Sequence, residues 1–113
     1  MTTYNFGDVV PVPFSFSDQS AIKKRPAIVA SSDEYSNRRP DLVIMAVTSQ
    51  MRWGNYYGDV VISDWQQAGL LKPSVIKPVF TTLEKAMVIK PLGQISDSDR
   101  TALAAVLQEI LGQ

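Results

Sequence analysis

A basic pair and a proline precede a short apolar segment, an arrangement that suits an anion site. Lys24 and Arg25 come directly before Pro26, and the apolar stretch 27–30 ends at a Ser-Ser-Asp turn. Such a run is typical of a strand that is buried on both faces. Pro26 biases Arg25 toward extended geometry, and a planar guanidinium suits the geometry of phosphate. The pattern indicates a phosphate site, with a solvated basic loop as the alternative.

Thr48 is the second candidate side chain, because it ends the next apolar run, 42–47. If the two runs are antiparallel neighbours joined by the turn 32–41, a register that sets Arg25 opposite Thr48 is expected. Directly opposed residues lie within about 5 Å of each other at Cβ. A guanidinium and a hydroxyl would then hold one phosphate, with Gln50 close by. Threonine is also common at strand ends, so a structural role is the alternative.

Short strands followed by one helix are expected to position these side chains. Strand character is seen over residues 9–14, 25–31, 42–48, 59–62, 74–82 and 86–95. Residues 33–41 read as a turn, 64–68 as a short helical turn, and Pro78 is expected to break its strand. Helical spacing over 97–111 predicts a helix, with a capping pair at Ser96 and Asp99. Its core-facing residues are expected to be Leu103, Val106, Leu107 and Ile110. The fold class is therefore mainly β with a C-terminal helix, closed as a small barrel.

Composition limits the possible functions. The 113 residues form one expected domain, 1–113, in which 11 Lys and Arg balance 11 Asp and Glu. A neutral chain is no broad clamp for duplex DNA, but a local basic site for a short single strand is allowed. The sequence has no cysteine and no histidine, which excludes disulfides, thiolate or imidazole metal sites, and Ser-His or Cys-His nucleophile pairs. With no signal-peptide pattern and no membrane-length apolar run, a soluble cytoplasmic protein without membrane contact is expected.

Several segments, in order along nearly the whole chain, resemble the MazF/PemK toxins. They are 7–10 with 13–14, 24–29, 46–50, 68–70 with 73–77, and 92–96. The resemblance implies an SH3-like barrel with a C-terminal helix, assembled as a homodimer. It also implies sequence-selective cleavage of single-stranded RNA without a metal or other cofactor. The implied partners are a cognate antitoxin and, only through that antitoxin, DNA.

The resemblance also carries over two catalytic residues. The family's Arg-Pro arginine corresponds to Arg25, and its threonine before a small residue and a glutamine corresponds to Thr48. The expected RNA contacts are Lys24, Asp18, Gln19, Gln50, Arg52, Trp53 and Lys77. The chain departs from the pattern at Lys77 and Val79, where some members have an arginine and an aspartate.

The sequence leaves two questions open: which group accepts the proton, and what the aromatic cluster contacts. Arginine stays protonated and is a poor general base, so the candidates are Glu84, Asp18, a lysine or water. The aromatic cluster consists of Arg52, Trp53, Tyr56 and Tyr57. Bases could stack on it, or it could pack an antitoxin or a second copy of the chain.

Two functions compete with RNA cleavage. One is a non-catalytic or weakly catalytic module that binds RNA or a peptide on the same barrel. The other is a co-regulator of transcription that acts together with its antitoxin.

Overall fold

The structure, a computed structural model, describes residues 3–13, 24–50, 56–88 and 90–112. Its strands are β1 (Asp8–Pro13), β2 (Lys24–Val29), β3 (Asp41–Thr48), β4 (Val60–Ile62), β5 (Ser74–Glu84) and β6 (Gly93–Gln94). Its helices are α1 (Asp33–Arg38), the 3-10 turn η2 (Lys85–Met87) and α2 (Asp97–Ile110). The predicted fold class, mainly β with a C-terminal helix, is confirmed.

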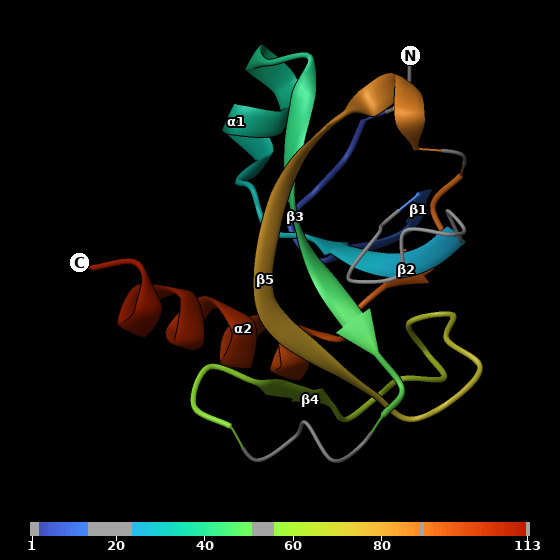
Figure 1. Ribbon diagram of the computed structural model, residues 1–113, viewed down its shortest axis with the longest axis vertical. Coiled ribbons are helices and arrows are strands. Elements are labelled where there is room, and N and C mark those ends of the chain that lie inside the picture. Colours follow the sequence, from blue (N-terminus) through green and yellow to red (C-terminus); the bar gives the residue numbers. More distant parts are fainter. Residues whose placement is uncertain (1–2, 14–23, 51–55, 89, 113) are drawn as a thin grey trace, which may run out of the picture.

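The described strands form one curved sheet of six strands in the order β4-β5-β3-β2-β1-β6. Every pairing recorded between them is antiparallel. Figure 1 shows β5 and β3 bending together through the middle of the molecule, with α2 beside β4 and the first half of β5. The curvature makes the sheet a half-barrel, whose two edge strands, β4 and β6, are short.

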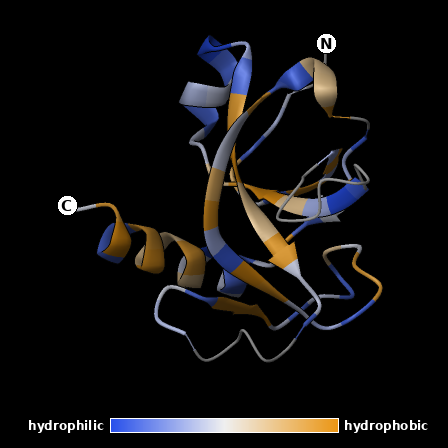
Figure 2. Cartoon of the chain, viewed as in Figure 1, coloured by the Kyte–Doolittle hydropathy of each residue, from blue (hydrophilic) through white to orange (hydrophobic). Residues whose placement is uncertain are grey.

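The central strands are buried on both faces, as their apolar runs predict. Along β2, Ile28 belongs to one core cluster, whereas Ala27 and Val29 belong to the other. Along β3, Met45 belongs to the cluster of Ile28, and Ile44 belongs to the cluster of Ala27 and Val29. Successive strand residues point to opposite faces, so one sheet supports two apolar layers. Figure 2 shows this apolar character as orange segments along β2 and β3.

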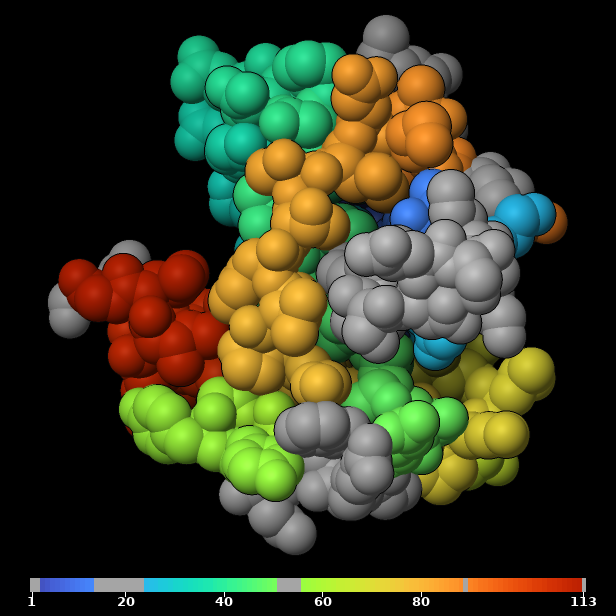
Figure 3. All heavy atoms as spheres, viewed as in Figure 1, coloured from blue at the N-terminus to red at the C-terminus, as the bar shows by residue number. Residues whose placement is uncertain are grey.

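The C-terminal helix has the predicted start and the predicted buried face. The Ser96 hydroxyl accepts a hydrogen bond from the Asp99 N–H at 3.2 Å, which caps the first turn. Leu103 is fully buried, Val106 and Leu107 pack against the same cluster, and Ile110 is half-buried. Figure 3 shows α2 in red lying against β5. The helix therefore covers the core at the β4 end of the sheet.

The expected turn over 33–41 is wrong, because residues 33–38 form α1. The Ser32 hydroxyl caps it by accepting from the Tyr35 N–H at 3.1 Å, and Asp33 accepts from the Phe6 N–H at 2.8 Å. Figure 2 draws α1 mostly in blue, so the helix has no apolar stripe. Caps and hydrogen bonds to the rest of the chain stabilise it instead.

Pro78 does not end its strand, contrary to the prediction. The partners of β3 shift between Met45, opposite Phe80, and Val47, opposite Ile76. Residues 77–79 therefore form a bulge, which is one of the few places where a sheet accepts proline. Pairing resumes beyond the bulge, and β5 runs on to Glu84.

Two further segments also differ from the prediction. Within 86–95, the described residues form the end of η2 and the short strand β6 instead of a long or bent strand. Residues 63–69 form successive turns, in which the Ala68 N–H bonds the Asp64 carbonyl at 3.2 Å. The predicted short helical turn is thus irregular, but it does end at Gly69, whose φ is +85°.

Candidate functional site

A pocket of about 440 Å³ opens where β2 begins, β3 ends and β5 begins. The described residues that line it are Arg25, Pro26, Val47, Thr48, Ser49, Gln50, Gly69, Leu70, Leu71, Lys72, Ser74 and Leu92. Figure 1 shows the arrowhead of β3 and the yellow turn beyond β4 on this side of the molecule. Arg25 and Thr48 are thus neighbours on one concave surface.

The register that sets Arg25 opposite Thr48 is the one that the structure has. The recorded β2–β3 pairs place Ala27 opposite Ala46 and Val29 opposite Ile44. Continued by two residues, that register reaches Arg25 and Thr48. The recorded pairing stops at Ala27, however, so the two side chains face a pocket rather than each other across a ladder.

Pro26 explains why the ladder stops. At the other end of the pair, the Ala30 N–H donates to the Val43 carbonyl at 2.8 Å. In an antiparallel pair, every second residue of a strand directs its N–H toward the same partner strand. Counting back from Ala30, the next residues of β2 that should donate to β3 are Ile28 and then Pro26. Pro26 has no N–H to donate. On its other side it lies opposite Pro11 of β1, where neither residue needs a donor. The proline therefore allows β2 to separate from β3 at Arg25.

The Thr48 hydroxyl is arranged so that it can donate a hydrogen bond into the pocket. It pairs with Val75 of β5, and its Oγ1 accepts the Gln50 N–H at 3.1 Å. A hydroxyl has one proton and two lone pairs. With one lone pair taken by the backbone, the Thr48 proton can be donated to an anion in the pocket.

The charged groups of the pocket are cationic. Arg25 and Lys72 carry positive charge, and none of the described lining residues is acidic. Thr48, Ser49 and Gln50 add hydroxyl and amide groups. Two cations beside hydrogen-bond donors favour a phosphate or another compact anion.

One part of the pocket wall depends on two glycines. A Cβ built on Gly69 would lie 2.6 Å from the Leu92 carbonyl oxygen, and one built on Gly93 would lie 2.6 Å from the Ala68 carbonyl oxygen. Any larger residue at either place would force two backbones apart. The turn that carries Leu71 and the start of β6 are therefore in direct backbone contact.

Of the predicted site residues, the structure brings Arg25, Thr48 and Gln50 together. Lys24 begins β2 opposite Pro13, and Lys77 lies in the β5 bulge; neither lines the pocket. The predictions for Asp18, Gln19, Arg52 and Trp53 fall outside the described residues.

Glu84 is excluded as the proton acceptor at this site. It lies opposite Asp41, at the start of β3, whereas Thr48 ends that strand. The whole length of β3 thus separates the Glu84 carboxylate from the pocket. Tyr56 and Tyr57 are exposed and are also absent from its lining.

Sequence reasoning missed Leu71 and Lys72. Their signal lay in topology: β5 runs antiparallel to β3, so the residues before β5 must lie beside the end of β3. Within the described ranges, no group of three or more acidic side chains is placed to hold a metal ion. No helix there is long and apolar enough to cross a membrane.

Comparison with known proteins agrees with the fold. A search of curated proteins found no match. MazF from Deinococcus radiodurans is 19% identical, with full coverage of both chains and a TM-score of 0.75. An endoribonuclease from a Mycobacterial species, solved in complex with its cognate antitoxin, is 18% identical over 99% of this chain and 96% of its own, with a TM-score of 0.72. The Mycobacterium tuberculosis toxin MazF-mt6 is 16% identical over 90% and 93%, with a TM-score of 0.73.

A family model extends the agreement from fold to sequence. The model for the PemK-like, MazF-like toxins of type II toxin–antitoxin systems matches residues 5–111. That range contains β1 to β6, α1, η2, α2 and every described residue of the pocket. The chain therefore belongs to the PemK-like, MazF-like toxin family of type II toxin–antitoxin systems.

Proposed function

We propose that this toxin is an endoribonuclease that cleaves single-stranded RNA in a sequence-selective, metal-independent reaction. The observation that carries the proposal is the position of Arg25 and Thr48 on one cationic pocket at a shared end of β2 and β3. The neighbouring structures whose names include "endoribonuclease" add support through the family.

The reaction is a transesterification within the RNA strand. The ribose 2′-oxygen gives its proton to the proton acceptor and bonds to the adjacent phosphorus, and the bond from phosphorus to the 5′-oxygen breaks as that oxygen takes up a proton from the protonated acceptor or from water. The products are a 2′,3′-cyclic phosphate and a 5′-hydroxyl end. Arg25 neutralises the charge that develops on the phosphoryl oxygens, and Thr48 donates a hydrogen bond to one of them. The reaction needs no nucleophile other than the ribose 2′-oxygen.

Glu84 drops out of the candidates for the proton acceptor, because it lies at the far end of β3. Water, a lysine, and Asp18, which is outside the described residues, remain. A chain without histidine has no side chain whose ordinary titration falls near neutral pH. A modest turnover is therefore expected.

The proposed assembly follows from the family and its neighbours. An endoribonuclease from a Mycobacterial species and MazF from Deinococcus radiodurans were solved with an antitoxin or with MazE. We expect this chain to bind a cognate antitoxin, to form a homodimer in the cytoplasm, and to contact DNA only through the antitoxin.

The test is RNA cleavage by the isolated toxin in excess EDTA. Wild type should cut single-stranded RNA and leave 2′,3′-cyclic phosphate ends, while Arg25→Ala should lose at least about 100-fold in rate. Arg38→Ala is the matched control, since Arg38 is exposed on α1 and pairs with the equally exposed Glu34 of the same helix. Wild-type cleavage by a folded Arg25→Ala protein, judged by circular dichroism, would refute the site.

The rival function is RNA binding without cleavage. This function is favoured by one observation: none of the described residues that line the pocket is acidic. A binding module would retain RNA in EDTA and release no cyclic phosphate ends, so the same experiment separates the two functions.

A further inference from the structure

One wall of the pocket has the features of a nucleotide-binding surface. It consists of Leu71 and Lys72, which precede β5, and Leu92, which precedes β6. Leu71 is 93% exposed and Leu92 is 48% exposed. We propose that this wall, here called the leucine–lysine wall, binds one nucleotide of single-stranded RNA next to the phosphate held by Arg25. The proposal rests on the proposed function in taking RNA as the ligand.

The leucine–lysine wall is held in place by its backbone. The Leu70 N–H donates to the Trp65 carbonyl at 3.1 Å, and the buried Ser74 hydroxyl donates to the Lys72 carbonyl at 2.9 Å. Leu70 itself belongs to the core cluster beneath α2. The contact between Gly69 and Leu92 fixes the remaining side. An exposed leucine on such a turn loses little freedom when a ligand covers it.

The chemistry of the pocket matches the two parts of a nucleotide. Lys72 and Arg25 supply two charges for consecutive phosphates. Leu71 and Leu92 supply an apolar face against which a flat base can pack, and Gln50 supplies an amide that can bond to a base edge. A pocket of about 440 Å³ lies within the size range of small-ligand sites. A nucleotide uses the cationic and the apolar side together.

Leu71 and Lys72 should be separable by the dependence of binding on salt. A lysine on a phosphate acts through counterion release, whereas a leucine under a base does not. Lys72→Gln should weaken RNA binding roughly five-fold and lower the slope of log affinity against log salt by about 0.7. Leu71→Ala should weaken binding by a similar factor, about five-fold, and leave the slope unchanged.

The probe is a fluorescent single strand of ten nucleotides with randomised sequence and 2′-O-methyl ribose throughout. It has no 2′-hydroxyl, so it cannot be cut, and fluorescence anisotropy reports binding alone. Arg38→Gln and Leu111→Ala are the matched controls, because both residues are exposed and neither lines the pocket. Both should bind like wild type.

Each outcome decides the proposal. Wild-type affinity and slope in folded Leu71→Ala and Lys72→Gln would overturn it, as would a wild-type protein that does not bind the strand. A change in oligomeric state for Leu71→Ala, at unchanged affinity, would assign the leucine to protein contacts instead. If wild type binds the strand through the leucine–lysine wall but fails to cleave unmodified RNA, the wall stands and the proposed nuclease activity falls.

Discussion

At one end of the β2–β3 pair the backbone is joined by hydrogen bonds, whereas at the other end the strands separate around a pocket. At the α1 end, the N–H groups of Ala30 and Ser31 both donate to the Val43 carbonyl. At the Arg25 end, Pro26 ends the recorded pairing. The same two strands therefore provide a rigid anchor at one end and an open site at the other.

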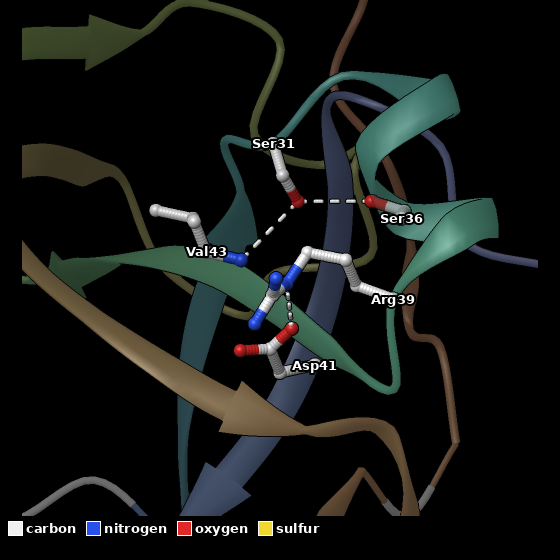
Figure 4. A network of polar contacts seen from close by, with 5 residues as sticks. All are labelled: Ser31, Ser36, Arg39, Asp41 and Val43. Carbon is white, nitrogen blue, oxygen red and sulfur yellow. Dashed lines mark hydrogen bonds and ion pairs between the residues drawn. The ribbon is translucent and has the colours of Figure 1, made fainter.

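The polar side chains at the two ends also differ. Near α1 they bond to one another: the Ser31 and Ser36 hydroxyls lie 2.9 Å apart, and Arg39 donates to Asp41 at 2.9 Å (Figure 4). In the pocket, cations and a hydroxyl line a concave surface. Variants at the α1 end should change stability and spare activity, and variants at the pocket end should do the reverse.

Among the variants that compare the two ends, Arg25→Lys is expected to have the largest effect. The change keeps the charge but removes the planar fork that binds a phosphate through two hydrogen bonds. We expect roughly a 100-fold loss of RNA cleavage, about 2.7 kcal/mol in barrier. Chemical unfolding should match wild type, because Arg25 is exposed. A lysine variant with full activity would show that charge alone suffices.

Thr48→Val is expected to have the next largest effect. Valine keeps the shape of threonine but removes the hydroxyl that accepts from the Gln50 N–H and faces the pocket. Cleavage should fall roughly ten-fold, about 1.4 kcal/mol. Thr48→Ser, which keeps the hydroxyl, should recover most of the rate in the same assay. Failure of serine to recover it would assign Thr48 a packing role.

Ser36→Ala should act on stability alone. Ser36 is fully buried and shares its hydrogen bond with Ser31. Loss of that bond should lower the free energy of unfolding by about 1 kcal/mol, measured by urea titration, with an unchanged rate of RNA cleavage. A clear loss of rate in the folded variant would contradict the division between the two ends.

Pro26→Ala tests the cause of the opening directly. Alanine supplies an N–H at a position where the alternation of β2–β3 bonds expects one, so the strands can pair one step further. We expect a loss of cleavage of roughly three-fold, and a change of less than about 1 kcal/mol in stability, because the gained bond offsets the lost rigidity. Unchanged cleavage would mean that Pro26 does not shape the pocket.

The smallest expected effect concerns pH. The hydrogen bond from Arg39 lowers the pKa of Asp41. A lowered pKa in the folded protein means that the pair stabilises above the unfolded value of about 4 and ceases to do so as the pH falls below it. Wild type should therefore melt slightly above Asp41→Asn at pH 7, and the difference should vanish in acid. A difference that grows in acid would reverse the assigned sign.

The sequence was sufficient where burial decided the structure. The apolar runs of β2 and β3 are buried on both faces, and the register assumed for them as antiparallel neighbours is the recorded one. The apolar spacing of α2 and its Ser96 cap were equally local. From these elements Arg25 and Thr48 could be placed at one end of the sheet.

Features that depend on long-range contacts could not be predicted. The helix α1 has no apolar stripe, and it relies on Asp33 bonding to Phe6, 27 residues away. The leucine–lysine wall depends on the contact of Gly69 with Leu92, which no local pattern reveals. Strand β5 continues past Pro78 because a bulge opposite β3 accommodates it.

Asp99 offers a way to observe how often the helix leaves the sheet. Its buried carboxylate accepts the N–H groups of Ser63 and Asp64, both at 3.0 Å, across more than thirty residues of chain. These two amides can exchange hydrogen with solvent only when the carboxylate withdraws. Their exchange rates, measured by NMR, would report how often the start of α2 leaves the turns at 63–69, which lead on to Gly69 and the pocket.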